Sequence, residues 1–179
     1  MCGEPEALRA LPRDDVEGAL KVAVMGGPLT AVEELLARGV VDLASKAGPL
    51  YVAAANGHHE VVSALIAAGA NVDLAHPNAG STPLFMAAQS GHHEVVAALT
   101  AARANVDLAT NDGITPLLQA AYEGHVEVVR LLVRAGADTT LGNSNGPPIN
   151  HICKAPGADK ANEGEIKAIL QRAGPRATT

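Results

Sequence analysis

The sequence predicts an all-α fold, a solenoid of stacked antiparallel helix pairs with hairpin-like connecting turns. The first observation is that a fourteen-residue segment occurs three times, at 49–62, 83–96 and 116–129. The second is that the motif Ala-Asn-Val-Asp-Leu at 70–74 returns at 104–108. The third is a hydrophobic content of 47% with one Phe, two Tyr and no Trp, typical of cores where small side chains let helices pack closely.

The first half of each copy predicts a short helix. Thr82 and Thr115 each precede a proline, and this order suits an N-cap residue followed by proline at the first helical position. The next eight residues are rich in alanine. A glycine then follows, at Gly57, Gly91 and Gly124, and we expect it to end the helix with a positive φ.

The second half of each copy predicts a second helix. Val95, Val96 and Leu99 form one apolar stripe at helical spacing, and the same stripe recurs in the neighbouring copies. Gly69 and Gly136 end this helix, and Arg103 occupies the corresponding position in the middle copy. A pair of this size leaves one face uncovered, so neighbouring pairs must stack and share a core.

These residues resemble the ankyrin-repeat family. The openings Gly80-Ser81-Thr82-Pro83-Leu84 and Gly113-Ile114-Thr115-Pro116-Leu117 are similar to the family's Gly-x-Thr-Pro-Leu. Gly-His-x-Glu-Val-Val followed by Ala-Gly-Ala-Asn/Asp matches the remainder of the repeat. The resemblance implies five units between residues 16 and 174, after an N-terminal segment at 1–15 and before a frayed tail at 175–179. The expected units are 16–45, 46–76, 77–109, 110–142 and 143–174.

Both terminal units depart from the pattern, as the ends of a solenoid commonly do. Asp14 or Asp15 offers an N-cap to the first unit ahead of Val16. In the last unit, Pro148 is expected to open a first helix in which Cys153 takes a small core position. The segment 155–159 is then an extended loop, and the second helix of this unit contains Ile166, Ile169 and Leu170.

The net charge and the cysteines restrict the class of binding partner and the cellular location that we expect. A formal net charge of −6 disfavours nucleic acid, whose phosphates require Lys and Arg. Cys2 and Cys153 have no metal-ligand or disulfide-framework spacing. No secretory signal and no membrane-spanning apolar stretch of about 20 residues is evident. We therefore expect a monomer in the cytoplasm or nucleus, with no membrane partner.

The histidine motifs do not predict a metal site. His58-His59-Glu60 and His92-His93-Glu94 contain zinc-type ligands, but adjacent helical residues point roughly 100° apart and do not converge on one ion. The family resemblance implies that the first histidine of each motif, including His125, bridges the loops of neighbouring units. The second histidine is expected to be exposed.

No motif predicts catalysis or a cofactor. The chain has no GxGxxG motif, phosphate-binding loop or GxSxG elbow. His151 and Cys153 are two residues apart, which places them on different sides of a helix. Tyr51, Phe85 and Leu118 replace the histidine of the family's Thr-Pro-Leu-His, and two interpretations stay open. They either pack between first helices or lie partly exposed as contact anchors.

The resemblance implies a non-catalytic protein-protein interaction module that binds a protein or peptide through its concave groove and hairpin tips. Ala44, Ser45, Ala47, Ala55 and Asn56 give the second unit contact area but few anchors. Alternatives are a host-directed effector, a scaffold subunit of a larger assembly, a spacer without a partner and, remotely, an unrecognised enzyme or metalloprotein. By register, the partner-binding candidates are Asn78, Ser81, Gln89, Ser90, Asn111, Asp112, Ile114, Tyr122 and Glu123.

Overall fold

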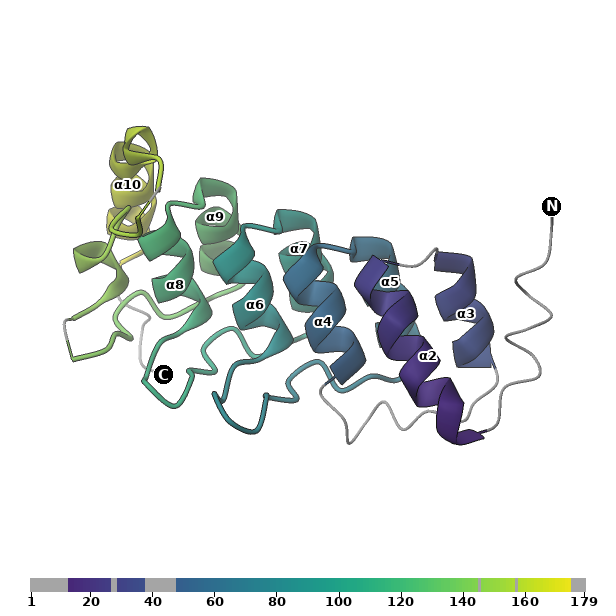
Figure 1. Cartoon of the computed structure of the whole chain (residues 1–179). Helices are drawn as coiled ribbons and strands as arrows, with labels where there is room; N and C mark the ends of the chain where they lie inside the picture. Colours follow the sequence, from purple (N-terminus) through teal and green to yellow (C-terminus); the bar gives the residue numbers. More distant parts are fainter. Residues whose placement is uncertain (1–12, 27–28, 38–47, 145, 157, 175–179) are drawn as a thin grey trace.

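The helices form a single row of stacked pairs (Figure 1). The structure is a computed structural model that describes residues 13–26, 29–37, 48–144, 146–156 and 158–174. The four successive pairs are α2 (Arg13–Gly26) with α3 (Leu29–Ala37), α4 (Gly48–Asn56) with α5 (His59–Ala67), α6 (Pro83–Ser90) with α7 (His93–Ala101), and α8 (Pro116–Glu123) with α9 (Val126–Arg134).

Two layers run the length of the row (Figure 1). Helices α2, α4, α6 and α8 lie side by side in one layer, and α3, α5, α7 and α9 form the other. Leucine and valine side chains fill the space between the layers. Small side chains occupy the contacts between first helices, as the alanine-rich sequence predicts, and six alanines there have no exposed surface. They are Ala53, Ala54, Ala87, Ala88, Ala120 and Ala121.

The inner first helices begin and end as predicted. Thr82 Oγ1 accepts a hydrogen bond from the backbone N–H of Phe85, and Thr115 Oγ1 accepts one from Leu118. Each threonine therefore satisfies a backbone donor that has no partner within its own helix. Gly91 closes α6 in the left-handed region, with φ 79°.

Asn and Asp recur at the same places in successive loops and connect neighbouring units by hydrogen bonds. Asp73 accepts a hydrogen bond at 2.8 Å from the backbone N–H of Asn105, one unit further along. Asp107 accepts one at 2.9 Å from Asp138 in the next unit. The repeated Asn-Val-Asp motif thus has a structural use, because a carboxylate that binds a backbone N–H satisfies a donor in its neighbour.

The two ends differ from expectation. Residues 14 and 15 lie inside α2, which begins at Arg13, so neither is the N-cap that the sequence suggested. The first helix of the last unit is also absent, because Pro148–Asn150 forms only the 3-10 turn η1. A second 3-10 turn, η2 (Lys160–Asn162), follows, and α10 (Glu163–Ala173) then packs on α9.

A left-handed residue explains why the last unit is not a full pair. Cys153 has φ 50°, which a helix does not allow, and its N–H bonds the carbonyl of Ala121 at 2.8 Å. Ala155 bonds the carbonyl of Tyr122 at 3.0 Å. This irregular segment therefore satisfies carbonyls at the end of α8 with its own backbone.

Arg103 has a left-handed backbone, with φ 64°, as its alignment with Gly69 and Gly136 suggested. Because an L-residue with a side chain is disfavoured in this region by about 1 kcal/mol, we expect Arg103→Gly to raise the melting temperature by roughly 2–4 °C. Thermal unfolding monitored by circular dichroism measures the change. An unchanged or lower melting temperature would show that Arg103 makes contacts that offset the strain.

Candidate partner-binding surface

The hairpin tips of the third and fourth units are joined into one edge. Within the fourth unit, the N–H of Thr110 bonds the carbonyl of Ile114 at 3.0 Å. Across the units, the N–H of Asn111 donates to the carbonyl of Ala79 at 3.1 Å, and Asn111 Nδ2 donates to the carbonyl of Asn78 at 3.1 Å. Two hydrogen bonds thus hold the neighbouring tips together, which fixes their relative position before any partner arrives.

Two candidate anchors lie at opposite ends of α8. Tyr122 lies in the last turn of this helix and Ile114 lies just before its N-cap, and both are half-buried. The carbonyl of Tyr122 accepts a hydrogen bond from Ala155. Glu123 accepts a hydrogen bond at 2.9 Å from the amide of Gln119. These hydrogen bonds hold the backbone of Tyr122 and the carboxylate of Glu123, while part of each residue stays open to solvent.

The nine candidate residues differ in their accessibility. Asn78, Ser90, Asn111 and Asp112 are exposed, and Gln89, Ile114, Tyr122 and Glu123 are half-buried.

Ser81 is the exception, because it is only 3% exposed and its hydroxyl is hydrogen-bonded to that of Tyr51 at 3.2 Å. A side chain so placed supports the hairpin and cannot reach a partner, so we remove it from the set. The second-unit residues Ala44, Ser45 and Ala47 lie outside the described residues.

Sequence reasoning missed one buried residue beside this surface and one exposed apolar residue elsewhere in the fourth unit. Gln119 is almost fully buried and orients the Glu123 carboxylate, an arrangement that the i, i+4 spacing of Gln and Glu could have suggested. Leu141 is 39% exposed in the segment between α9 and η1. The repeat could have marked it, because Leu141 takes the position that Leu74 and Leu108 have at the end of the two Ala-Asn-Val-Asp-Leu motifs.

The replacements for the histidine of Thr-Pro-Leu-His pack inside the stack. Phe85 and Leu118 are buried at 7% and 2% exposure, which confirms the packing interpretation for both. Tyr51 is half-buried beside His76, with ring centroids 5.4 Å apart. The accessible aromatic side chain of the fourth unit is instead Tyr122.

A histidine connects each of two inner units to the preceding unit by a hydrogen bond. His92 Nε2 lies 3.1 Å from the carbonyl oxygen of Ala55, and His125 Nε2 lies 3.0 Å from that of Gln89. A carbonyl only accepts, so each ring donates through Nε2. Each ring also lies against a glycine: a Cβ on Gly57 would be 2.7 Å from the His92 ring. The bridging role that the resemblance implied is confirmed for these two histidines. It is not observed for His58, whose Nε2 is buried and has no hydrogen-bond partner among the described residues.

Comparison with known families agrees with this geometry. A family model described as ankyrin repeats (3 copies) matches residues 20–110 and 50–143. The chain belongs to the ankyrin-repeat family. Ankyrin repeats are generally protein-protein interaction modules. No curated protein matches the chain significantly.

The last interface of the stack departs from the ankyrin histidine lock. At Gly124, the neighbouring unit contributes Cys153, and a Cβ on this glycine would be 3.0 Å from its sulfur. The thiol donates to the carbonyl of Asp159 at 3.3 Å, and Asn162 Nδ2 donates to the carbonyl of Gly124 at 3.0 Å. Burial raises the pKa of Cys153, which disfavours the reactive thiolate. The residue is buried as expected, although in a turn and not in a helix.

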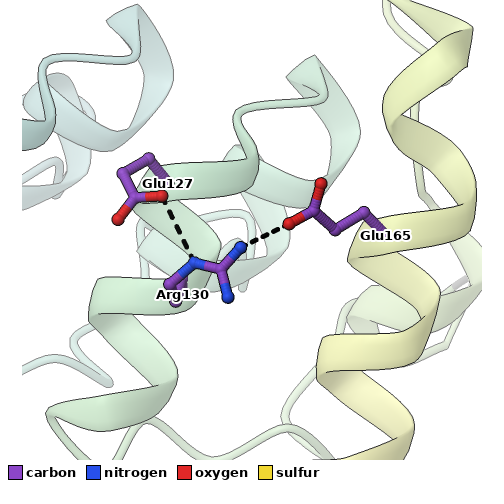
Figure 2. A network of polar contacts seen from close by, with 3 residues as sticks. All are labelled: Glu127, Arg130 and Glu165. Atoms are coloured by element: carbon purple, nitrogen blue, oxygen red, sulfur yellow. Dashed lines mark hydrogen bonds and ion pairs between the residues drawn. The ribbon is translucent and has the colours of Figure 1, made fainter.

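The face formed by the second helices of the ankyrin stack has exposed histidines and a network of charged side chains. His59 and His93 are exposed there, as predicted. Figure 2 shows Arg130 of α9 between two carboxylates: its Nε donates to Glu127 at 3.2 Å, and its Nη2 donates to Glu165 of α10. These hydrogen bonds raise the pKa of Arg130, and the bond to Glu127 has the largest effect. The network connects the last helix to the body of the stack.

Two further observations on the described residues concern metal ions and membranes. No group of three or more His, Cys, Asp or Glu side chains in this part of the chain is arranged to hold a metal ion. Within the same residues, every helix is too short or too polar to cross a membrane.

Proposed function

We propose that this chain is a non-catalytic interaction module that binds a protein or peptide along the hairpin tips and first helices of its third and fourth ankyrin units. The observation that carries the proposal is the joined edge at Asn78, Ala79 and Asn111, which continues to Ile114 in the hairpin of the fourth unit, with Tyr122 at the other end of α8. A preorganised surface loses little conformational entropy on binding, which favours affinity.

The charge of this surface indicates what kind of partner suits it. Residues 75–92 contain no charged Lys, Arg, Asp or Glu side chain, and residues 109–125 contain only Asp112 and Glu123. The exposed amides of Asn78 and Asn111 add polar groups. A partner with an apolar side chain for Tyr122 and Ile114, surrounded by hydrogen-bond donors or basic groups, is therefore complementary.

Binding energy should be concentrated at the two anchors. Tyrosine offers a large, stiff ring with a polar end, and such residues dominate measured interface energies. Tyr122→Ala and Ile114→Ala should each weaken binding by about 1 kcal/mol or more, which is about fivefold. Neither side chain is fully buried, so the fold should persist in both variants.

The test compares three immobilised forms of the full chain in one native lysate by quantitative mass spectrometry. The first is unaltered, the second carries Tyr122→Ala with Ile114→Ala, and the third carries His59→Ala with His93→Ala as a matched double substitution on exposed positions of the second helices. We expect a protein that the first and third forms retain and the second loses. Affinities for that protein then give the single-residue effects by calorimetry.

The opposite pattern would contradict the proposal. If the histidine variant loses the retained protein while the Tyr122 and Ile114 variant keeps it, binding uses the face formed by the second helices.

A further inference from the structure

One glutamate of the stack lies at the wrong end of its helix. The helix dipole stabilises a negative charge in the first turn and disfavours one at the C-terminal end, which is itself negative. In helices α4 to α10, the glutamates that lie in first turns are Glu60, Glu94, Glu127, Glu163 and Glu165. Glu123 is instead the last residue of α8. Its position therefore costs the helix some stability.

The stack does not compensate this cost with a counter-ion. Glu123 Oε1 accepts a hydrogen bond from Gln119 Nε2 at 2.9 Å, and no ion pair reaches the carboxylate from the described residues. Glu127 and Glu165, by contrast, both pair with Arg130. Glu123 is half-buried, so water screens its charge less than that of a fully exposed carboxylate.

The lysine beside this end of α8 also leaves the carboxylate unpaired. Lys154 precedes Ala155, whose N–H bonds the carbonyl of Tyr122, the residue before Glu123. Lys154 is exposed, and it forms no ion pair with Glu123 in the part of the chain that the structure describes. The carboxylate is therefore available to a cation from another molecule.

The neighbouring units show that the stack itself needs no charge at this position. Asn56 and Ser90 occupy it in the second and third units, each just before the glycine that ends the first helix. Both are exposed. A local rule that is broken without a structural gain commonly marks a functional residue.

We propose that Glu123 determines specificity by binding a lysine or arginine side chain of the partner, an inference that rests on the proposed binding surface. A cation is favoured here by the carboxylate and by the negative end of the α8 dipole. Residues 109–125 contain no Lys or Arg that would repel it, and their other charge is the acidic Asp112. The partner therefore presents a basic residue beside the apolar side chain that contacts Tyr122.

The stability of Glu123→Gln tests the inference without a partner. Glutamine keeps the shape of the side chain and an oxygen that can accept from Gln119, so only the charge is lost. We expect a melting temperature about 1–2 °C higher than that of the unaltered chain. The matched control is Glu94→Gln, which removes a charge from the first turn of α7 and should lower the melting temperature by a similar amount. A lower melting temperature in Glu123→Gln would assign the carboxylate to stability and overturn the proposal.

Peptides selected from a random phage library against the full chain test the partner class. We expect the enriched peptides to combine apolar residues with a lysine or arginine. Such a peptide should bind Glu123→Gln about fivefold more weakly than the unaltered chain, and its affinity for Glu94→Gln should be unchanged. A version of the peptide with glutamine in place of the basic residue should bind the unaltered chain and Glu123→Gln equally. The fivefold difference should shrink as the salt concentration rises.

Two binding results would overturn this inference alone. One is an enriched set of peptides without lysine or arginine, and the other is equal affinity of a basic peptide for the unaltered chain and Glu123→Gln. Peptides that bind equally well after Tyr122→Ala with Ile114→Ala would instead contradict the proposed binding surface. Different variants therefore distinguish the failure of the two proposals.

Discussion

Ala88→Leu is expected to destabilise the fold by about 1–3 kcal/mol, the usual cost of forcing extra methylene groups into a packed core. Ala88 has no exposed surface and lies on α6, which packs against both α4 and α8. The close approach of these three helices depends on small side chains. A leucine must therefore separate two helix pairs or adopt a strained rotamer.

Chemical denaturation of Ala88→Leu measures this loss against Ala97→Leu, which adds the same side chain at an exposed position of the adjacent helix α7. The control should change the free energy of unfolding by less than about 0.5 kcal/mol, as surface substitutions usually do. Full stability in Ala88→Leu would show that the first helices are not as closely packed as the structure indicates.

Gly91→Ala should lower the free energy of unfolding by about 2 kcal/mol, and two effects combine in that loss. The positive φ of 79° strains any side chain by about 1–2 kcal/mol. In addition, the new Cβ would be 2.8 Å from Cε1 of His125, whose ring is held by its hydrogen bond to Gln89. Moving the ring away breaks that bond, which costs about 0.5–1.5 kcal/mol.

Gly69→Ala separates the two effects. Gly69 has φ 87°, but a Cβ there would have nothing within 4 Å, so it reports the backbone strain alone. The excess loss in Gly91→Ala over Gly69→Ala then measures the contact between neighbouring units. Equal losses in the two variants would mean that the histidine lock adds nothing to stability.

The inner units could be predicted closely because each residue type there has one dominant structural use. Threonine before proline caps a helix, alanine allows close helix packing, and glycine takes the positive φ of the turn. Thr82, Ala88 and Gly91 all have the predicted role. The repeat strengthens each assignment, since the same residue type returns in the same place.

The last unit could not be predicted in the same way, because its structure depends on contacts that leave no periodic pattern. The left-handed backbone of Cys153 is supported by hydrogen bonds to Ala121 and Asp159, residues that the sequence does not mark as its neighbours. A register based on the inner units therefore placed Cys153 in a helix. Its replacement of the bridging histidine at Gly124 is visible only in three dimensions.

The candidate surface could be predicted by position but not by accessibility. Register alone put Ser81 beside Asn78 on the hairpin, yet Ser81 turns inward to Tyr51. The sequence also does not indicate that Asn111 pairs the two hairpin tips, because its N–H donates to a backbone carbonyl of the neighbouring unit. Residue type does not reveal which hairpin side chains are used for the stack itself.

Amide hydrogen exchange of the full chain, with and without the captured partner, tests the central claim most directly. The account predicts slower exchange in the partner's presence at residues 76–81, 110–114 and 119–123, and unchanged exchange in α5 and α7. Slower exchange in α5 and α7, with the hairpin tips and the end of α8 unaffected, would contradict it.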